Sequence, residues 1–262
     1  MKGYKGFNKG LICRGKQYAE NTVFEEDGTI ICKKGMRFCV DPLEVLNYYP
    51  MLNENGEENE FAEVESLDAA VTNDGKEYVS KKLRIIKKVS IDELFAAGTK
   101  QIVENSETAD SNNKPLTKTV PSSYYSKIGS SGNYSQIGSS GYYSQIASSG
   151  NYAKIGSSGY GVQIASSGYD AQIGSSGNYA QIASSGNCAK ITSTGKNVVI
   201  CCAGKGCAVK GKKGTWITLA EWKYINDEYV PVCVKTKKID GVKIKEDTFY
   251  ILKNGKFTEI EK

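Results

Sequence analysis

The sequence predicts a mainly β protein, in which a small α+β domain is followed by a parallel β-solenoid and an antiparallel β cap. The solenoid prediction rests on a nine-residue repeat that begins near Ser122, in which one glycine and one isoleucine recur at intervals of nine residues. The glycines are Gly132, Gly141, Gly150, Gly159, Gly168, Gly177, Gly186, Gly195 and Gly204, and the isoleucines are Ile128, Ile137, Ile146, Ile155, Ile164, Ile173, Ile182, Ile191 and Ile200.

A second period indicates the size of the coil. The residue after the isoleucine alternates between glycine and alanine, as in Gly138 and Ala147, so two nonapeptides form one coil of 18 residues. We expect the strand to be the Tyr-Ser-Gln-Ile part of each unit. Because Ser135 becomes alanine or valine in later copies, its side of the strand faces the interior with isoleucine, and tyrosine and glutamine face outward.

Two other interpretations of the repeat stay open. One is a disordered low-complexity tract, although such a tract needs no isoleucine at every ninth residue. The other is a calcium-binding nonapeptide roll, which needs aspartate in its turns. The turn here is Ser-Ser-Gly, and Asp170 is the only acid in the array, so we expect neither calcium nor another metal. Serine hydroxyls are expected to satisfy the backbone of the turns.

The other segments differ in composition. Residues 1–100 indicate an α+β head, with helices over 41–49 and 90–98 and strands over 60–66 and 78–91. Asp41 and Ser90 or Asp92 are the expected N-caps, and Gly98 the expected end of the second helix. We interpret 101–121 as a linker, 122–204 as the solenoid array, and 205–262 as the cap. Hairpin turns are expected at 225–227, 238–243 and 253–256, and Trp216 and Trp222 are expected to cover the last coil.

Composition excludes several classes of function. The chain of 262 residues has no apolar run that could cross a membrane and no secretory leader, so we expect a cytoplasmic protein of the host cell. It has eight cysteines, none in a C-x-x-C pair, and no histidine. A structural zinc site and a histidine-dependent hydrolase are therefore not expected, and the cysteines are interpreted as small buried hydrophobes.

Two resemblances bear on function. The block "YKGF…CRGKQY…GMRFCVDPLEVLNYY…FAEVE", with the later "WITLAEW", resembles an uncharacterised domain of phage and prophage proteins, which implies a mobile-element origin. More distantly, the head resembles ADP-ribosyltransferases. That resemblance implies Lys5 or Arg14 on the phosphates of NAD and Glu63 or Glu65 beside the ribose, although the Ser-Thr-Ser element of the family is absent. Without that activity we expect no cofactor.

The outward ladder is the expected binding surface. Rigid tyrosines beside polar side chains favour binding of a protein partner. The mobile-element resemblance implies that this partner is a host defence protein and that it is inhibited, as an anti-CRISPR protein would do. A spacer, a structural solenoid of a phage particle, pairing of two copies, and a nucleic-acid or glycan ligand are the alternatives. The array has only four lysines, and Lys205, Lys210, Lys212 and Lys213 form either a phosphate contact or a solvated face. The expected binding residues are Tyr134, Gln136, Tyr143, Gln145, Tyr152, Lys154, Gln163, Gln172, Tyr179 and Gln181.

Overall fold

The computed structural model describes residues 1–28, 34–106, 118–119 and 124–260. The chain divides into two compact units, one of which spans Met1–Gly98 and the other Thr99–Ile260. Each unit is described by itself below. The fold is mainly β, with an α+β head, a parallel solenoid of 18-residue coils and antiparallel strands at its end, as the sequence predicts.

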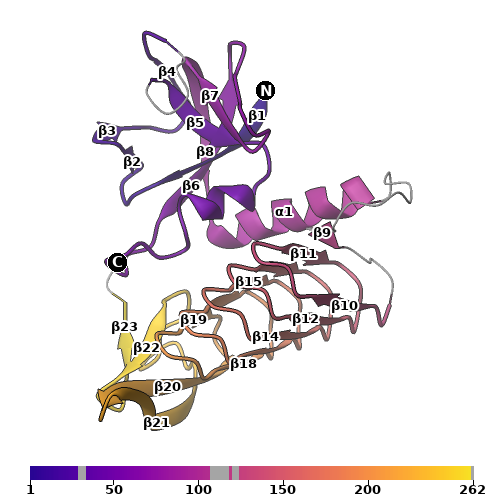
Figure 1. The fold of residues 1–262 in the computed structure, drawn as a ribbon, viewed down its shortest axis with the longest axis vertical. Coiled ribbons are helices and arrows are strands. Elements are labelled where there is room, and N and C mark those ends of the chain that lie inside the picture. The colour runs from indigo at the N-terminus through magenta and orange to yellow at the C-terminus, as the bar shows by residue number, and fades with distance from the viewer. Residues whose placement is uncertain (29–33, 107–117, 120–123, 261–262) are drawn as a thin grey trace. The chain divides into compact units, whose positions relative to one another are not determined.

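The first unit is built on an antiparallel sheet with the strand order β4-β8-β6-β1-β5-β7 (Figure 1). Its core contains the buried side chains of Phe7, Phe38, Val64 and Leu83, which the alternation of the strands directs to one face. A small hairpin of β2 and β3 follows β1. The strands are β1 (Lys2–Phe7), β2 (Ile12–Cys13), β3 (Lys16–Gln17), β4 (Thr22–Glu25), β5 (Met36–Cys39), β6 (Glu60–Ser66), β7 (Glu77–Ser80) and β8 (Lys82–Val89).

The predicted helix over 41–49 is a single 3₁₀ turn, η1 (Glu44–Asn47), although Asp41 does accept a hydrogen bond from the backbone N–H of Leu43 at 3.0 Å. Helix α1 (Ile91–Ser106) begins as predicted. Its capping box joins the N–H of Glu93 to Ser90 Oγ at 3.2 Å, and the N–H of Ser90 to Glu93 Oε2 at 2.7 Å.

The expected end of α1 at Gly98 is wrong, because the helix continues to Ser106. Gly98 serves close packing instead, since a Cβ there would lie 2.4 Å from Leu43 Cγ. The helix therefore takes up the first residues of the predicted linker. Most of the remainder, residues 107–117 and 120–121, lies outside the described residues, apart from β9 (Lys118–Thr119), which pairs with β11.

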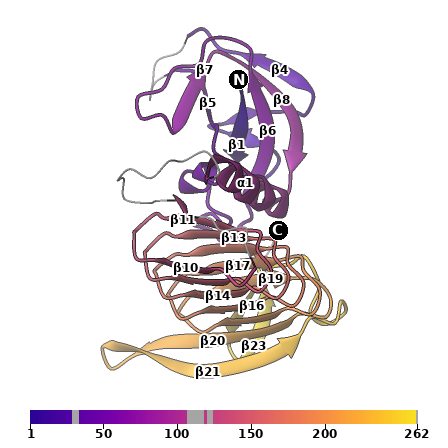
Figure 2. The same ribbon diagram turned by 90° about the vertical axis from the view of Figure 1, so that its right-hand side faces the viewer.

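The second unit contains the solenoid. Each coil contributes one strand to each of two parallel sheets, which Figures 1 and 2 show along two sides of the coils. The register places isoleucine beside isoleucine, as in Ile137 beside Ile155 and Ile146 beside Ile164. One sheet contains β10 (Lys127–Ser130), β12 (Gln145–Ser148), β14 (Gln163–Ser166), β16 (Gln181–Ser184) and β18 (Val199–Cys202), and the other contains β11 (Gln136–Ser139), β13 (Lys154–Ser157), β15 (Gln172–Ser175), β17 (Lys190–Ser193) and β19 (Ala208–Gly211).

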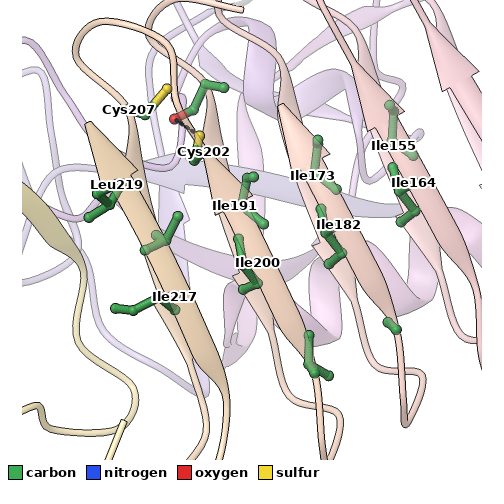
Figure 3. Packing of buried hydrophobic residues seen from close by; sticks show 14 of the residues in the cluster. Ile155, Ile164, Ile173, Ile182, Ile191, Ile200, Cys202, Cys207, Ile217 and Leu219 are labelled. Carbon is green, nitrogen blue, oxygen red and sulfur yellow. Dashed lines mark hydrogen bonds between the residues drawn. The ribbon is translucent and has the colours of Figure 1, made fainter. Parts of the chain in front are cut away.

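Isoleucines from both sheets form the core, as predicted (Figure 3). The strands, however, comprise Gln-Ile-Gly/Ala-Ser and not Tyr-Ser-Gln-Ile. Tyr134 lies in the preceding turn with φ +59°, in the left-handed region, so the chain bends there and extends only from Gln136. The inward residue two positions after Ile137 is therefore Ser139, which is fully buried.

The turns explain the repeated glycine and asparagine. A Cβ on Gly168 would lie 1.9 Å from the carbonyl oxygen of Gly150 in the preceding coil, so only glycine permits the coil spacing. Asn133 and Asn151 each accept a hydrogen bond from a backbone N–H of the next coil, at 2.9 and 2.8 Å. Asparagine thus satisfies backbone groups for which serine was the expected partner, although Ser144 Oγ also donates to the carbonyl of Gly141.

The solenoid continues beyond the array. Strands β19 and the first part of β20 (Trp216–Ile225) pair in parallel with β17 and β18, so coil geometry reaches Leu219. The cap consists of two hairpins, β20–β21 (Glu228–Lys238) and β22–β23 (Tyr250–Lys253 and Lys256–Glu259). The expected turns at 225–227 and 253–256 are confirmed. The one at 238–243 closes no hairpin and is an Asx turn on Asp240.

Candidate functional site

We call the outward side of β10, β12, β14, β16 and β18 the outer face. It presents a column that begins with Lys127 and ends with Val199, and beside it a column of small residues. The glutamines and alanines between these ends are exposed, whereas the isoleucines between the columns are buried. A shallow trough of about 890 Å³ follows the columns. The exposed residues are Gln145, Gln163, Gln181, Ala147, Ala165 and Ala183.

Tyrosine ladders lie in the turns at both edges of the outer face. At one edge, Tyr143 stacks on Tyr125 with ring centroids 5.4 Å apart, and Tyr160 and Tyr179 are 5.0 Å apart. At the other edge, Tyr134 stacks on Tyr152 at 4.8 Å, with the two rings inclined by 8°. These rings are more than one third exposed, so they offer aromatic surface while they hold one another in place.

The opposite sheet is not exposed, which corrects part of the expected binding surface. Gln136, Lys154 and Gln172 point out of the coil as the pleat requires, but they are only 4%, 1% and 4% exposed. The C-terminal half of α1, from Thr99, belongs to the same compact unit as the coils. The outward positions beside the three buried side chains are glycines, which let neighbouring chain approach the sheet closely: Gly138, Gly156 and Gly174.

Charge is sparse on the solenoid. Lys127 is the only charged side chain in the outer face column, and Asp170 and Lys190 neutralise each other in an ion pair of 2.5 Å. Three of the four lysines of the basic cluster also have partners. Lys205 lies 3.5 Å from the ring centroid of Tyr229, Lys210 lies 4.6 Å from that of Phe249, and Lys212 pairs with Asp247 at 2.6 Å.

The first unit contains a cavity of about 300 Å³, which we call the head cavity. Lys5 and Arg14 line it, but Glu63 and Glu65 do not. In the register of β1 and β6, Lys5 pairs with Ala62 and Glu63 pairs with Tyr4, so Lys5 and Glu63 lie on opposite faces of the sheet. Glu65 pairs with Arg84 at 3.1 Å. The structure therefore brings the two basic residues together and leaves the two carboxylates elsewhere.

Burial governs the electrostatics of the head cavity. Desolvation lowers the pKa of Lys5, and the charge of Arg14 lowers it further, while Cys13 and Glu77 oppose this effect. Desolvation raises the pKa of Tyr18 and of Tyr49, and raises that of Tyr48 to about 12. These phenols are therefore neutral hydrogen-bond donors at neutral pH.

The comparisons with known proteins concern the first unit. Residues 1–97 match the model of a family described as "Domain of unknown function (DUF7666)". No curated protein and no solved structure matches the chain. The DUF7666 domain thus coincides with the first compact unit and leaves the solenoid outside the match.

Several residues of the head cavity in the DUF7666 domain were not predicted from the sequence. Tyr18 was not considered, and Cys13 was interpreted only as a hydrophobe, yet its Sγ lies 3.1 Å from Tyr49 Oη. The alternation of β1, which directs Lys5 inward beside Phe7, was the signal that could have found this site. Over residues 1–28, 34–106, 118–119 and 124–260, no cluster of three metal-ligating side chains occurs, and no helix is long and apolar enough to span a bilayer.

Proposed function

We propose that the protein is a non-enzymatic binding protein that holds a protein partner against the outer face of its solenoid. The observation that carries this proposal is the outer face itself. It is a rigid parallel sheet that exposes alanine and glutamine over three coils between two tyrosine ladders. Such a surface is complementary to a flat and largely uncharged protein surface.

The side chains suit protein recognition. Each tyrosine contributes a large contact area and a hydroxyl at low entropic cost, because the ring has few rotatable bonds and the ladder already restrains it. Glutamine offers both a donor and an acceptor, and the alanines let a partner approach the sheet. Nucleic acid is disfavoured as the ligand, because phosphate binding needs an array of cations and the column presents Lys127 alone.

The resemblance to phage and prophage proteins supports the choice of a partner class. We propose a protein of the host cytoplasm, such as a defence nuclease, whose activity is blocked when the solenoid covers its surface. The support consists of that resemblance and of a surface whose exposed side chains are recognition groups.

A matched pair of variants tests the proposal. Ala165→Arg places a long charged side chain in the middle of the outer face, whereas Ser158→Arg adds the same side chain at an exposed turn outside it. A partner captured from host lysate by the full chain is purified, and its affinity is measured by surface plasmon resonance. We expect Ala165→Arg to weaken binding at least tenfold and Ser158→Arg to leave it unchanged. Equal affinities would refute the assigned face.

Two alternatives have their own readouts. If light scattering shows that the chain forms a dimer and that Ala165→Arg abolishes it, the occupant of the outer face is a second copy of the chain. An ADP-ribosyltransferase would transfer label from NAD to host protein and lose this activity on Glu63→Ala or Glu65→Ala. We expect no such transfer, because Lys5 and Glu63 lie on opposite faces of the sheet.

A further inference from the structure

The head cavity contains two positive charges that no carboxylate of the described residues neutralises. Lys5 is 4% exposed, and its Nζ donates a hydrogen bond to the carbonyl oxygen of Arg37 at 2.9 Å. Neither Lys5 nor Arg14 forms an ion pair within the part of the chain that the structure describes. A buried ammonium without a counter-ion is costly, and an anion bound beside Lys5 would remove that cost.

The other charged groups of the head cavity neutralise one another. Lys16 Nζ lies 3.5 Å from Glu26 Oε1, and Arg37 Nη1 lies 3.4 Å from Glu77 Oε2. When both groups are protonated, Lys5 and Arg14 therefore give the lining a charge of about +2. A phosphate monoester carries a charge of about −1.5 to −2 at neutral pH and matches this excess, whereas a single carboxylate would leave one cation uncompensated.

Arg14 occupies an unusual backbone position. With Gly15 it forms the two-residue turn between β2 and β3, and both residues have positive φ, +50° and +75°. Such a type I′ turn strongly favours asparagine or aspartate at its first position, because the left-handed conformation strains longer side chains. Strain of this kind is typical of functional positions. The turn places the guanidinium close enough to Lys5 to lower its pKa.

The uncharged lining suits the rest of such a ligand. Tyr18 and Tyr49 supply neutral hydroxyl donors, and Phe38 and Tyr48 also line the head cavity. Aromatic walls favour a planar ring, which they can contact face to face or edge to face. A volume of about 300 Å³ lies at the lower end of small-molecule sites and suits a compact ligand.

From this geometry we propose that the head cavity binds a small molecule that carries a phosphate monoester and a planar ring, the chemistry of a nucleoside monophosphate. The phosphate lies between Lys5 and Arg14, and the ring lies against the tyrosines. This site belongs to the DUF7666 domain, and it does not depend on the outer face.

Calorimetry on the full chain tests the site with four probes: adenosine 5′-monophosphate, ribose 5-phosphate, inorganic phosphate and adenosine. We expect the monophosphate to bind one site per chain, and adenosine to bind at least tenfold more weakly. The main variant is Arg14→Asn, which removes the charge and supplies the residue that the turn prefers, so loss of binding cannot be ascribed to unfolding. We expect at least a tenfold loss of affinity with no decrease in melting temperature.

Two control variants show whether binding depends on the head cavity in particular. Arg84→Gln removes an arginine that pairs with Glu65 outside the head cavity, and Ala165→Arg alters only the outer face. Both should bind the monophosphate as the unaltered chain does. Binding of adenosine as tight as that of its monophosphate, no binding of either, or an unchanged affinity in Arg14→Asn would overturn the site. If inorganic phosphate bound as tightly as the monophosphate, the ring would contribute nothing to binding, and the planar-ring part of the proposal would be refuted.

Discussion

Replacement of Gly168 by alanine should destabilise the solenoid more than any exposed substitution. The new methyl carbon would lie 1.9 Å from the carbonyl oxygen of Gly150, whereas ordinary contact begins at 3.4 Å. Both atoms involved are close to the backbone, so no side chain can rotate away. The two coils must therefore separate locally by about 1.5 Å, the difference between these distances.

The hydrogen bonds beside Gly168 set the magnitude. The N–H of Ser167 donates to the carbonyl of Ser148 at 3.0 Å, and the N–H of Tyr169 donates to Asn151 Oδ1 at 2.8 Å. A shift of 1.5 Å breaks both, and each bond contributes about 0.5–1.5 kcal/mol. Alanine also restricts the unfolded chain, which offsets about 0.4–1 kcal/mol. With lost packing of the neighbouring isoleucines included, we expect a net destabilisation of about 1–3 kcal/mol.

Gly129 supplies the matched control. No atom lies within 4 Å of a Cβ built on it, and it pairs with Ala147 in the next coil, so alanine is already accepted at this position of the strand. Gly129→Ala should leave stability unchanged or raise it by about 0.5–1 kcal/mol. Urea unfolding gives the stability of both variants, and hydrogen exchange of peptides from the coils shows whether the change lies in the solenoid. If Gly168→Ala were as stable as Gly129→Ala, steric exclusion would not explain the repeated glycine.

Three further substitutions test buried polar groups, capping and charge. Ser166 Oγ is buried and has no hydrogen-bond partner among the described residues, so Ser166→Ala should raise the melting temperature while the exposed Ser167→Ala should not. Ser90→Ala removes the cap of α1 and should cost about 1 kcal/mol, seen as faster amide exchange at the start of the helix. Because the pKa of Lys5 is lowered on folding, the unfolded chain binds more protons between that pKa and 10.5. The stability of the head should therefore rise with pH in this range, and Lys5→Met should abolish the rise in denaturation curves.

The repeat predicted the coil because its signals were steric. Isoleucine at every ninth position had to face the interior, and the burial of these side chains confirms this. The strand limits were missed because Tyr134 lies at positive φ, a conformation that the sequence gives no reason to expect of tyrosine. The stacking of Tyr134 on Tyr152 provides a contact that offsets this strain and forms only between coils.

Burial of one sheet and exposure of the other could not be predicted from the nonapeptide. The residue before isoleucine is glutamine or lysine in both sheets, so Gln136 and Gln145 look alike in sequence, yet only the first is buried. The residue after isoleucine did differ, since Gly138 lies in the buried sheet and Ala147 in the exposed one. The alternation that indicated two nonapeptides per coil therefore also distinguishes the covered sheet from the outer face.

The placement of charge on the outer face follows from the ends of the sheet. Hairpin β20–β21 covers one end, whereas β10 is the terminal strand at the other end within the described residues, and it carries Lys127. A lysine on an edge strand opposes pairing with another chain, because burial of its charge is unfavourable. The inner coils need no such charge and can keep a neutral surface for a partner. Lys127→Gln should therefore produce concentration-dependent association in light scattering, whereas Lys196→Gln, in an exposed turn, should not. Monomeric behaviour of Lys127→Gln at all concentrations would contradict this role of the edge lysine.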